Sequence, residues 1–138
     1  MDNTSKQPLP LRGVKVIELG TLIAGPYAGG LFAQFGAEVI KVETPVEGDP
    51  LRKWRKLHQG TSLWWYTQSR NKKSITINLK SERGQQIVRD LVKDAQIVIE
   101  NFRPGTLEKW NLGWEQLSQI NPSLIMVRIS GYGQSGPY

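Results

Sequence analysis

Short β-branched runs alternate with helix-like segments along most of this chain, and that alternation limits the folds open to it. The first run, residues 14–19 (VKVIEL), is followed by a glycine-rich turn over 20–26 and by a helix predicted over 27–35. Pro26 lies near the first position of that helix, where proline is favoured. A second run over 38–43 (EVIKVE) completes the pattern, which predicts a βαβ unit.

The same alternation returns after a long loop predicted over residues 44–60. The elements predicted beyond it are helical turns over 61–68, a strand over 74–79, a helix over 81–93, a strand over 95–100, a helical turn over 106–110, a helix over 114–120 and a strand over 124–129. Strands that alternate with helices indicate a mostly parallel sheet with helices on both faces. The predicted fold class is therefore α/β.

The domain organisation follows from the two ends of the chain. Residues 1–10 are polar and are predicted to be a flexible tail, which leaves 11–138 as one domain. The chain stops in a glycine-rich stretch directly after a strand, so we expect it to be the N-terminal part of a longer protein. No apolar run reaches membrane-spanning length and the tail has no apolar signal core, so we expect a cytoplasmic protein with no membrane partner.

The charge and the residue types narrow the classes of function. A formal charge of +6 could suit a solvated basic face, a ligand with several phosphates or, third in rank, nucleic acid. The absence of cysteine excludes a disulfide scaffold, a thiol nucleophile and a thiolate metal site. The single histidine, His58, sits in a basic loop and is interpreted as a surface or packing residue. No metal-ligand spacing and no set of catalytic residues is present in the sequence.

A candidate binding site lies where the predicted strands end, because ligands of open parallel sheets bind outside the carboxyl ends of the strands. The segments at that edge are residues 20–25, 43–45, 79–80, 101–103 and 130–136. They include two cations, Lys80 and Arg103, and an aromatic ring, Phe102. Glycine backbone and a helix start favour phosphate, so the set suits a nucleotide-like ligand.

Simpler interpretations of the same residues stay open. The glycines of the first turn match neither the dinucleotide nor the Walker A fingerprint, so tight packing explains them about as well as a ligand does. Glu43 stands where dinucleotide folds place a ribose-binding acid, but alone it is interpreted as a solvated strand end. Lys80 is equally compatible with a plain surface position.

The order of several segments resembles the start of class III CoA-transferases of the CaiB/BaiF type. The segments are LRGVKVIELG, AGPYAGGLFAQFGAEVIKVE, GDPLR, SRNKKSITINLK, IENFRPGTLEKWNLGWEQL and NPSLIMVRISGYGQSGPY. That family includes formyl-CoA transferase, carnitine CoA-transferase and α-methylacyl-CoA racemase. The resemblance implies a Rossmann-like large domain, of which residues 11–138 would be the N-terminal part, and an interlocked homodimer.

The resemblance also implies coenzyme A as the ligand, with acyl-CoA and a carboxylic acid acceptor as substrates and no metal. The CoA contacts that it implies are Ile23, Ala24, Thr44, Ile77, Asn78, Leu79, Lys80, Asn101, Phe102, Arg103 and Lys109. Many relatives carry an arginine where this chain has the uncharged Thr44.

The activity implied by the resemblance is transfer of CoA between carboxylic acids through an enzyme carboxylate. The catalytic aspartate of the family lies beyond residue 138, so no catalytic residue is expected in this chain and the chain alone is expected to be inactive. An acyl-CoA racemase or epimerase of the same family is the first alternative. A nucleotide-binding module without catalysis is the alternative from another class.

Overall fold

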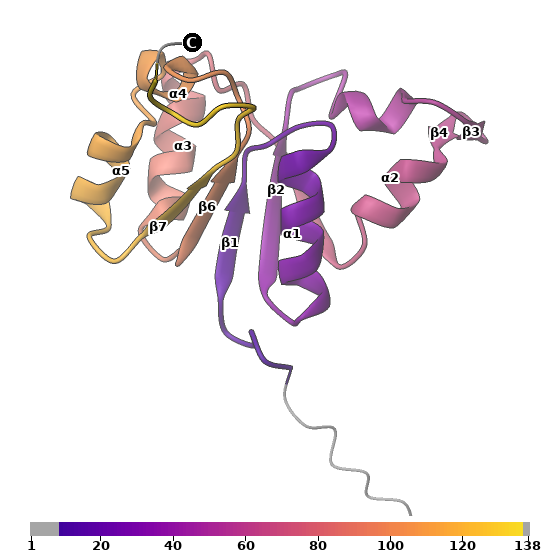
Figure 1. Cartoon of the computed structure of the whole chain (residues 1–138), viewed down its shortest axis with the longest axis horizontal. Coiled ribbons are helices and arrows are strands. Elements are labelled where there is room, and N and C mark those ends of the chain that lie inside the picture. The colour runs from indigo at the N-terminus through magenta and orange to yellow at the C-terminus, as the bar shows by residue number, and fades with distance from the viewer. Residues whose placement is uncertain (1–8, 137–138) are drawn as a thin grey trace, which may run out of the picture.

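A computed structural model describes residues 9–136 of the chain. Its centre is a five-stranded sheet in the order β5-β2-β1-β6-β7, and every neighbouring pair in it is parallel. The sheet strands are β1 (Lys15–Glu18), β2 (Glu38–Glu43), β5 (Lys72–Thr76), β6 (Ile97–Glu100) and β7 (Ile125–Arg128). This arrangement, shown in Figure 1, confirms the α/β fold class predicted from the sequence.

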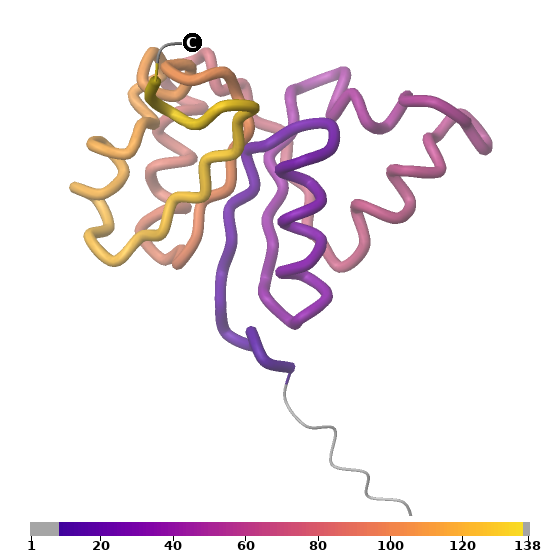
Figure 2. Tube along the Cα trace, viewed as in Figure 1, coloured from indigo at the N-terminus to yellow at the C-terminus, as the bar shows by residue number. Residues whose placement is uncertain are grey.

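Helices cover both faces of the sheet, as Figures 1 and 2 show. The helical elements are α1 (Ala24–Gln34), a 3-10 turn (Pro50–Lys53), α2 (Leu63–Gln68), α3 (Glu82–Val92), α4 (Thr106–Lys109) and α5 (Trp114–Ile120). One apolar cluster packs the β1–β2–β6 face against α1, and a larger one packs the opposite face against α3, α4 and α5. Burial of these two clusters supplies the main driving force for folding.

Local sequence explains where the two long helices begin and how they dock. The Ser81 hydroxyl accepts a hydrogen bond from the Gly84 amide and so caps α3, as predicted. The other long helix, α1, begins at Ala24, three residues earlier than the prediction. Its buried side consists mostly of glycine and alanine, which lets the helix backbone approach the sheet closely.

The strand predicted over 74–79 is wrong in its position, because β5 covers Lys72–Thr76. The apolar alternation that suggested the later range belongs to residues that follow the strand. Asn78 Oδ1 accepts a hydrogen bond from the Lys80 amide, and this local turn ends the extended backbone. The start of β5 was hidden because two lysines occupy it.

The loop predicted over 44–60 is more ordered than expected. It contains the 3-10 turn, capped by the Asp49 carboxylate, which accepts from the Leu51 amide. A short antiparallel hairpin follows, made by β3 (Leu57–His58) and β4 (Thr61–Ser62). No helix in residues 9–136 combines the length and apolar character needed to cross a bilayer.

Two expectations, a flexible tail over residues 1–10 and a glycine-rich loop over 130–138, concern the ends of the chain, which the structure describes in part. Residues 1–8 of the predicted tail, and residues 137–138 of the glycine-rich stretch, lie outside the described residues. Within the described part, the Leu9 carbonyl accepts a hydrogen bond from the Arg12 amide, and this turn leads into β1.

Candidate functional site

A small, mostly apolar cavity of about 80 Å³ opens where the strands end. Its lining combines residues from the ends of β1 and β2, the segment after β5 and the segment after β6: Leu19, Thr21, Val42, Glu43, Thr44, Ile77, Asn78, Leu79, Lys80, Phe102 and Trp110. The rings of Phe102 and Trp110 meet edge to face with centroids 5.4 Å apart and form one wall. The cavity therefore lies at the carboxyl edge of the sheet, as expected for a ligand site of this fold.

The structure brings together six of the residues predicted to contact a ligand. They are Thr44, Ile77, Asn78, Leu79, Lys80 and Phe102, all of which line the cavity. The lining also includes Leu19, Thr21, Val42 and Trp110, which the sequence reasoning did not single out. Trp110 could have been found, because it is the last residue of the helical turn predicted directly after the loop that carries Phe102.

Three cations near this edge are available to a ligand. Lys80 lines the cavity, Arg103 follows its aromatic wall, and Lys109 is the last residue of α4. All three are exposed, and none forms an ion pair within residues 9–136. By contrast, Arg52 and Arg128 are tied to carboxylates. The unpaired cations can neutralise phosphates without first giving up a protein partner.

Asn101 fastens the loop after β6 to the turn after β1. Its Oδ1 accepts from the Thr21 amide at 2.7 Å and its Nδ2 donates to the Thr21 carbonyl at 2.9 Å. A Cβ placed on Gly20 would lie 2.7 Å from Asn101 Oδ1, so glycine is needed for this close approach. Both polar ends of Asn101 are therefore used inside the protein, and its role is to hold the turn in place.

The other two predicted contacts, Ile23 and Ala24, lie at the start of α1 and are exposed. Ile23 precedes the helix and has no polar side chain with which to cap it, and the first turn of α1 carries no acidic residue. The amide groups of that turn favour a negative charge. Because α1 packs on the opposite face of the sheet from α3 and α4, a ligand that touches both Ile23 and Phe102 must cross the carboxyl edge.

Glu43 is not the solvated strand end expected from the sequence, because it is only 3% exposed. Its carboxylate accepts two hydrogen bonds from the Arg52 guanidinium, at 2.6 and 2.8 Å, and one from the Asp49 amide. Burial raises the pKa of Glu43, but these bonds and one from Ser74 outweigh it and lower the pKa to about 2. Glu43 thus stays ionised and anchors the loop after β2.

Thr44, which follows Glu43, also has a structural partner. Its hydroxyl donates to the Gly48 carbonyl at 2.9 Å and closes the turn that leads to the 3-10 segment. The side chain borders the cavity but adds no charge to it. Any phosphate contact at this position would therefore use a neutral group in place of a cation.

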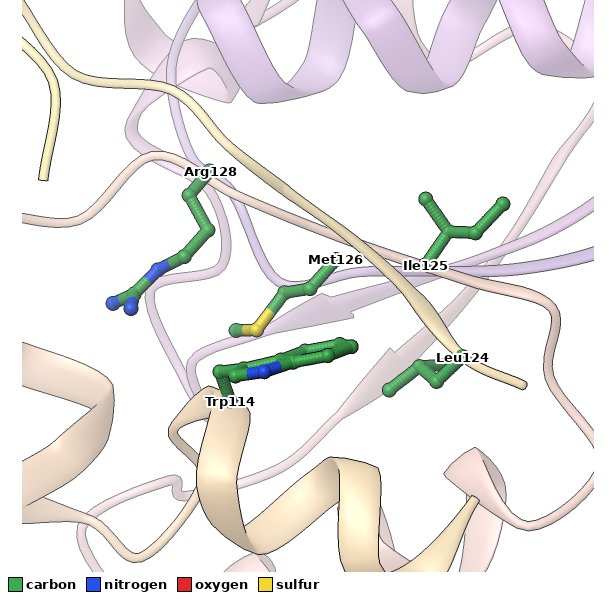
Figure 3. Close-up of a pocket in the computed structure, with 5 residues that line it drawn as sticks. All are labelled: Trp114, Leu124, Ile125, Met126 and Arg128. Carbon is green, nitrogen blue, oxygen red and sulfur yellow. The ribbon is translucent and has the colours of Figure 1, made fainter. Parts of the chain in front are cut away.

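A larger hollow of about 390 Å³ lies beside the edge strand β7. Figure 3 shows the Trp114 ring below the strand, with Met126 and Leu124 on either side of it and Arg128 pointing away. Arg128 bonds Glu100 and Glu108, at 2.8 and 2.7 Å, so it is already neutralised. This hollow has no unpaired charge with which to recognise an anion, and we do not assign the ligand to it.

The described residues hold no cluster of His, Asp or Glu that could bind a metal ion. His58 is exposed, on the short hairpin away from the sheet edge. The arrangement at the cavity can bind and orient an anionic ligand with an aromatic or apolar end.

Comparison with known proteins shows the family of the chain. Residues 11–138 match the model of CoA-transferase family III. The chain is 56% identical over 137 residues to the succinyl-CoA–D-citramalate CoA-transferase of Chloroflexus aurantiacus, which covers 99% of this chain and 34% of the relative. It is 43% identical over 144 residues to the succinate–glutarate CoA-transferase of Agrobacterium fabrum, covering 99% of this chain and 36% of the relative.

Solved structures give the same result. A CaiB/BaiF family protein from Brucella suis matches with a TM-score of 0.88 and 44% identity, over 96% of this chain and 36% of that one. The chain thus spans about a third of the length of the proteins it matches. On the family match, the relatives and the shared architecture, the chain belongs to CoA-transferase family III.

Proposed function

We propose that this chain forms the CoA-binding part of an enzyme that moves coenzyme A between carboxylic acids. The observation that carries the proposal is an aromatic-walled cavity at the carboxyl edge of the sheet that Lys80 lines, with two further exposed cations, Arg103 and Lys109, next in sequence to the two rings of its wall. Family membership and relatives named as CoA-transferases support the same activity.

The residues at this edge fit the chemistry of CoA. The adenine ring is flat and apolar on its faces, so the wall made by Phe102 and Trp110 suits it. The phosphates are anions, which Lys80, Arg103 and Lys109 would neutralise together with the amides at the start of α1. Ile77 and Leu79 would lie along the uncharged pantetheine arm, and the turn around Ile23 and Ala24 would contact the far side of the nucleotide.

In the proposed reaction a carboxylate outside this chain attacks the acyl-CoA thioester and releases the CoA thiolate, which leaves an acyl–enzyme anhydride. The thiolate then attacks the enzyme carbonyl, so that the donor acid departs and an enzyme–CoA thioester forms. The acceptor carboxylate attacks the enzyme–CoA thioester and releases the CoA thiolate, which gives an acceptor–enzyme anhydride. The thiolate then attacks the acceptor carbonyl of this anhydride, so the acceptor leaves as acyl-CoA and the enzyme carboxylate is restored. The contribution of this chain is to hold CoA throughout, because the released thiolate must not diffuse away.

The names of the relatives suggest substrates for the test. Several are named for succinyl-CoA as donor, and their acceptors are the dicarboxylic acids citramalate, malate and glutarate. We therefore propose that the donor is the CoA thioester of a dicarboxylic acid and that the acceptor is a second dicarboxylic acid. The full-length enzyme, given succinyl-CoA and each acid in turn, is expected to form the new acyl-CoA only when an acceptor is present.

The same assay run in deuterated water separates the alternatives. Deuterium uptake at the α-carbon, together with no acceptor-dependent formation of a new acyl-CoA, would show a racemase and would refute CoA transfer. Binding of CoA without CoA transfer and without exchange of the α-proton would indicate a nucleotide-binding module that has no catalytic activity. A titration in which NAD binds and CoA does not would refute the assignment of CoA to this site.

We further propose a cytoplasmic homodimer. Relatives whose names include α and β subunits make a heteromeric assembly the competing arrangement. Native mass spectrometry of the full-length protein expressed alone tests this, because a homodimer is expected at twice the subunit mass. A monomer that gains CoA-transferase activity only with a second chain would contradict it.

A further inference from the structure

Four charged side chains are buried together beneath the turn that follows β1. They are Glu18 of β1, Lys41 of β2, Asp49 of the loop after β2, and Lys72 of β5; we call them the buried quartet. Lys41 Nζ lies 3.0 Å from Glu18 and 2.7 Å from Asp49, and Lys72 Nζ lies 2.7 Å from Glu18. Their side chains are at most 2% exposed. The two positive and two negative charges cancel.

Apart from the bond by which Asp49 caps the 3-10 turn, the quartet also bonds the backbone of the turn after β1 and the start of α1. Lys41 Nζ donates to the Gly20 carbonyl at 2.9 Å. The Asp49 carboxylate accepts from the Leu22 amide at 3.1 Å. Beyond the turn, Lys72 Nζ donates to the Pro26 carbonyl in the first turn of α1 at 2.6 Å. The segment from residue 20 to residue 26 is thus held at three points by charged groups.

This turn needs such support, because Leu22 has a φ of +66°, a conformation that side-chain-bearing residues rarely adopt. Asn101 holds the turn at Thr21, one residue earlier, and Asp49 holds it at Leu22 itself. The strained backbone persists only where its surroundings fix it, and such strain is concentrated at binding and catalytic sites. The turn leads directly to Ile23 and Ala24, the proposed CoA contacts at the start of α1.

A purely stabilising role does not explain the quartet well. Removing four charges from water is costly, and apolar residues of similar volume usually stabilise a core as well or better. Buried ions do, however, impose one geometry on the groups they bond. The quartet bonds the segment over 20–26 at three points, while the exposed ion pair of Glu38 and Lys73, on β2 and β5, makes no hydrogen bond to that segment.

We propose that the buried quartet is a positioning device, which presets the turn at residues 20–24 so that CoA meets a site already in its bound shape. None of the four side chains needs to touch CoA. This inference rests on the proposed function, because it assigns the turn to CoA. A preformed site loses less conformational freedom on binding, so breaking the quartet must weaken CoA binding and leave the chemical step unchanged.

The test is a charge-balanced double variant of the full-length enzyme, Lys41→Met with Asp49→Ser. Serine still caps the 3-10 turn but is too short to reach the Leu22 amide, and the remaining Glu18 and Lys72 keep the buried charge at zero. We expect KM for acyl-CoA and Kd for CoA to rise roughly tenfold, with kcat changed less than twofold. The Leu22 amide should exchange its hydrogen faster.

The matched control is Glu38→Gln with Lys73→Met, which removes the exposed ion pair from β2 and β5 and should leave KM, Kd and kcat at wild-type values. If the double variant does not fold, Asp49→Asn replaces it. Asparagine keeps the shape and one acceptor but weakens the link to Lys41, so a roughly threefold rise in KM is expected.

The outcomes separate the two proposals. Wild-type enzyme that does not bind CoA refutes the proposed function, whatever the variants do. Wild-type enzyme that binds CoA, together with a folded quartet variant of unchanged Kd, overturns the positioning role alone. A variant with lower kcat at unchanged KM also overturns it, because the quartet would then act in the chemical step.

Discussion

The clearest quantitative prediction concerns Glu43, whose carboxylate is buried and bonded to Arg52. Its pKa is lowered from 4.5 to about 2. At about 1.4 kcal/mol per pKa unit, this shift corresponds to roughly 3 kcal/mol of folding stability at neutral pH. Because 37% of the Arg52 side chain is exposed, solvent screening reduces the expected value to about 2 to 3 kcal/mol.

The direction of the pH dependence follows from the same shift. The folded pKa lies below the unfolded one, so the stabilisation is complete above pH 4.5 and is lost as the pH falls towards 2. Glu43→Gln mimics the protonated carboxyl. The variant should therefore be about 2 to 3 kcal/mol less stable than wild type at pH 7, and the difference should shrink by roughly 1.4 kcal/mol at pH 3.5.

The assay is urea denaturation followed by tryptophan fluorescence, at pH 7 and at pH 3.5. Trp65 is a suitable reporter, because the Arg52 guanidinium lies 3.8 Å above its ring and moves when Glu43 releases it. Glu47→Gln, an exposed change in the same loop, is the control and should alter stability by less than about 0.5 kcal/mol. A stability gap between wild type and Glu43→Gln that is the same at both pH values would refute the reasoning.

Three further predictions concern single contacts. Asn121→Ala removes the side-chain donor from the Val92 and Ala95 carbonyls, of which the Val92 carbonyl keeps the Ala95 amide, and should cost about 2 kcal/mol in urea denaturation; a loss below about 1 kcal/mol would contradict this. Gly84→Ala places a Cβ against the Asn78 carbonyl, so it should lower the melting temperature by several degrees. An unchanged melting temperature would contradict this, because α3 would then shift to make room for the methyl group. Lys80→Ala should raise Kd for CoA about threefold to tenfold, an effect that shrinks with added salt, while the distant Lys93→Ala should leave Kd unchanged.

The apolar parts of the fold could be predicted from the sequence, and the charged parts could not. The runs VKVIEL and EVIKVE predict β1 and β2, because buried parallel strands are rich in β-branched residues. The start of β5 was missed because Lys72 looks like a surface residue. Its burial depends on Glu18, which lies far away in the sequence and becomes a neighbour only when the sheet forms.

The same limit applies to the candidate site. Placing the candidate site at the ends of strands pointed to Lys80 and Phe102, which both line the cavity, because parallel topology alone brings those segments to one edge. Glu43 was misread as solvated, since the hydrogen bonds that keep it buried come from Arg52 and from a backbone amide. Sequence pattern reports polarity and periodicity, but it does not report which charges cancel each other after folding.

The bonds between Asn101 and Thr21 have a consequence for the order of folding. They join residues 80 positions apart, so they form later than the contacts that the buried quartet makes within the first βαβ unit and β5. During synthesis, a nascent chain released as far as β5 would already contain the quartet and its bonds to Gly20 and Leu22, while Thr21 would still lack its partner. The last hold on the turn would arrive when β6 docks beside β1 and brings Asn101 to Thr21.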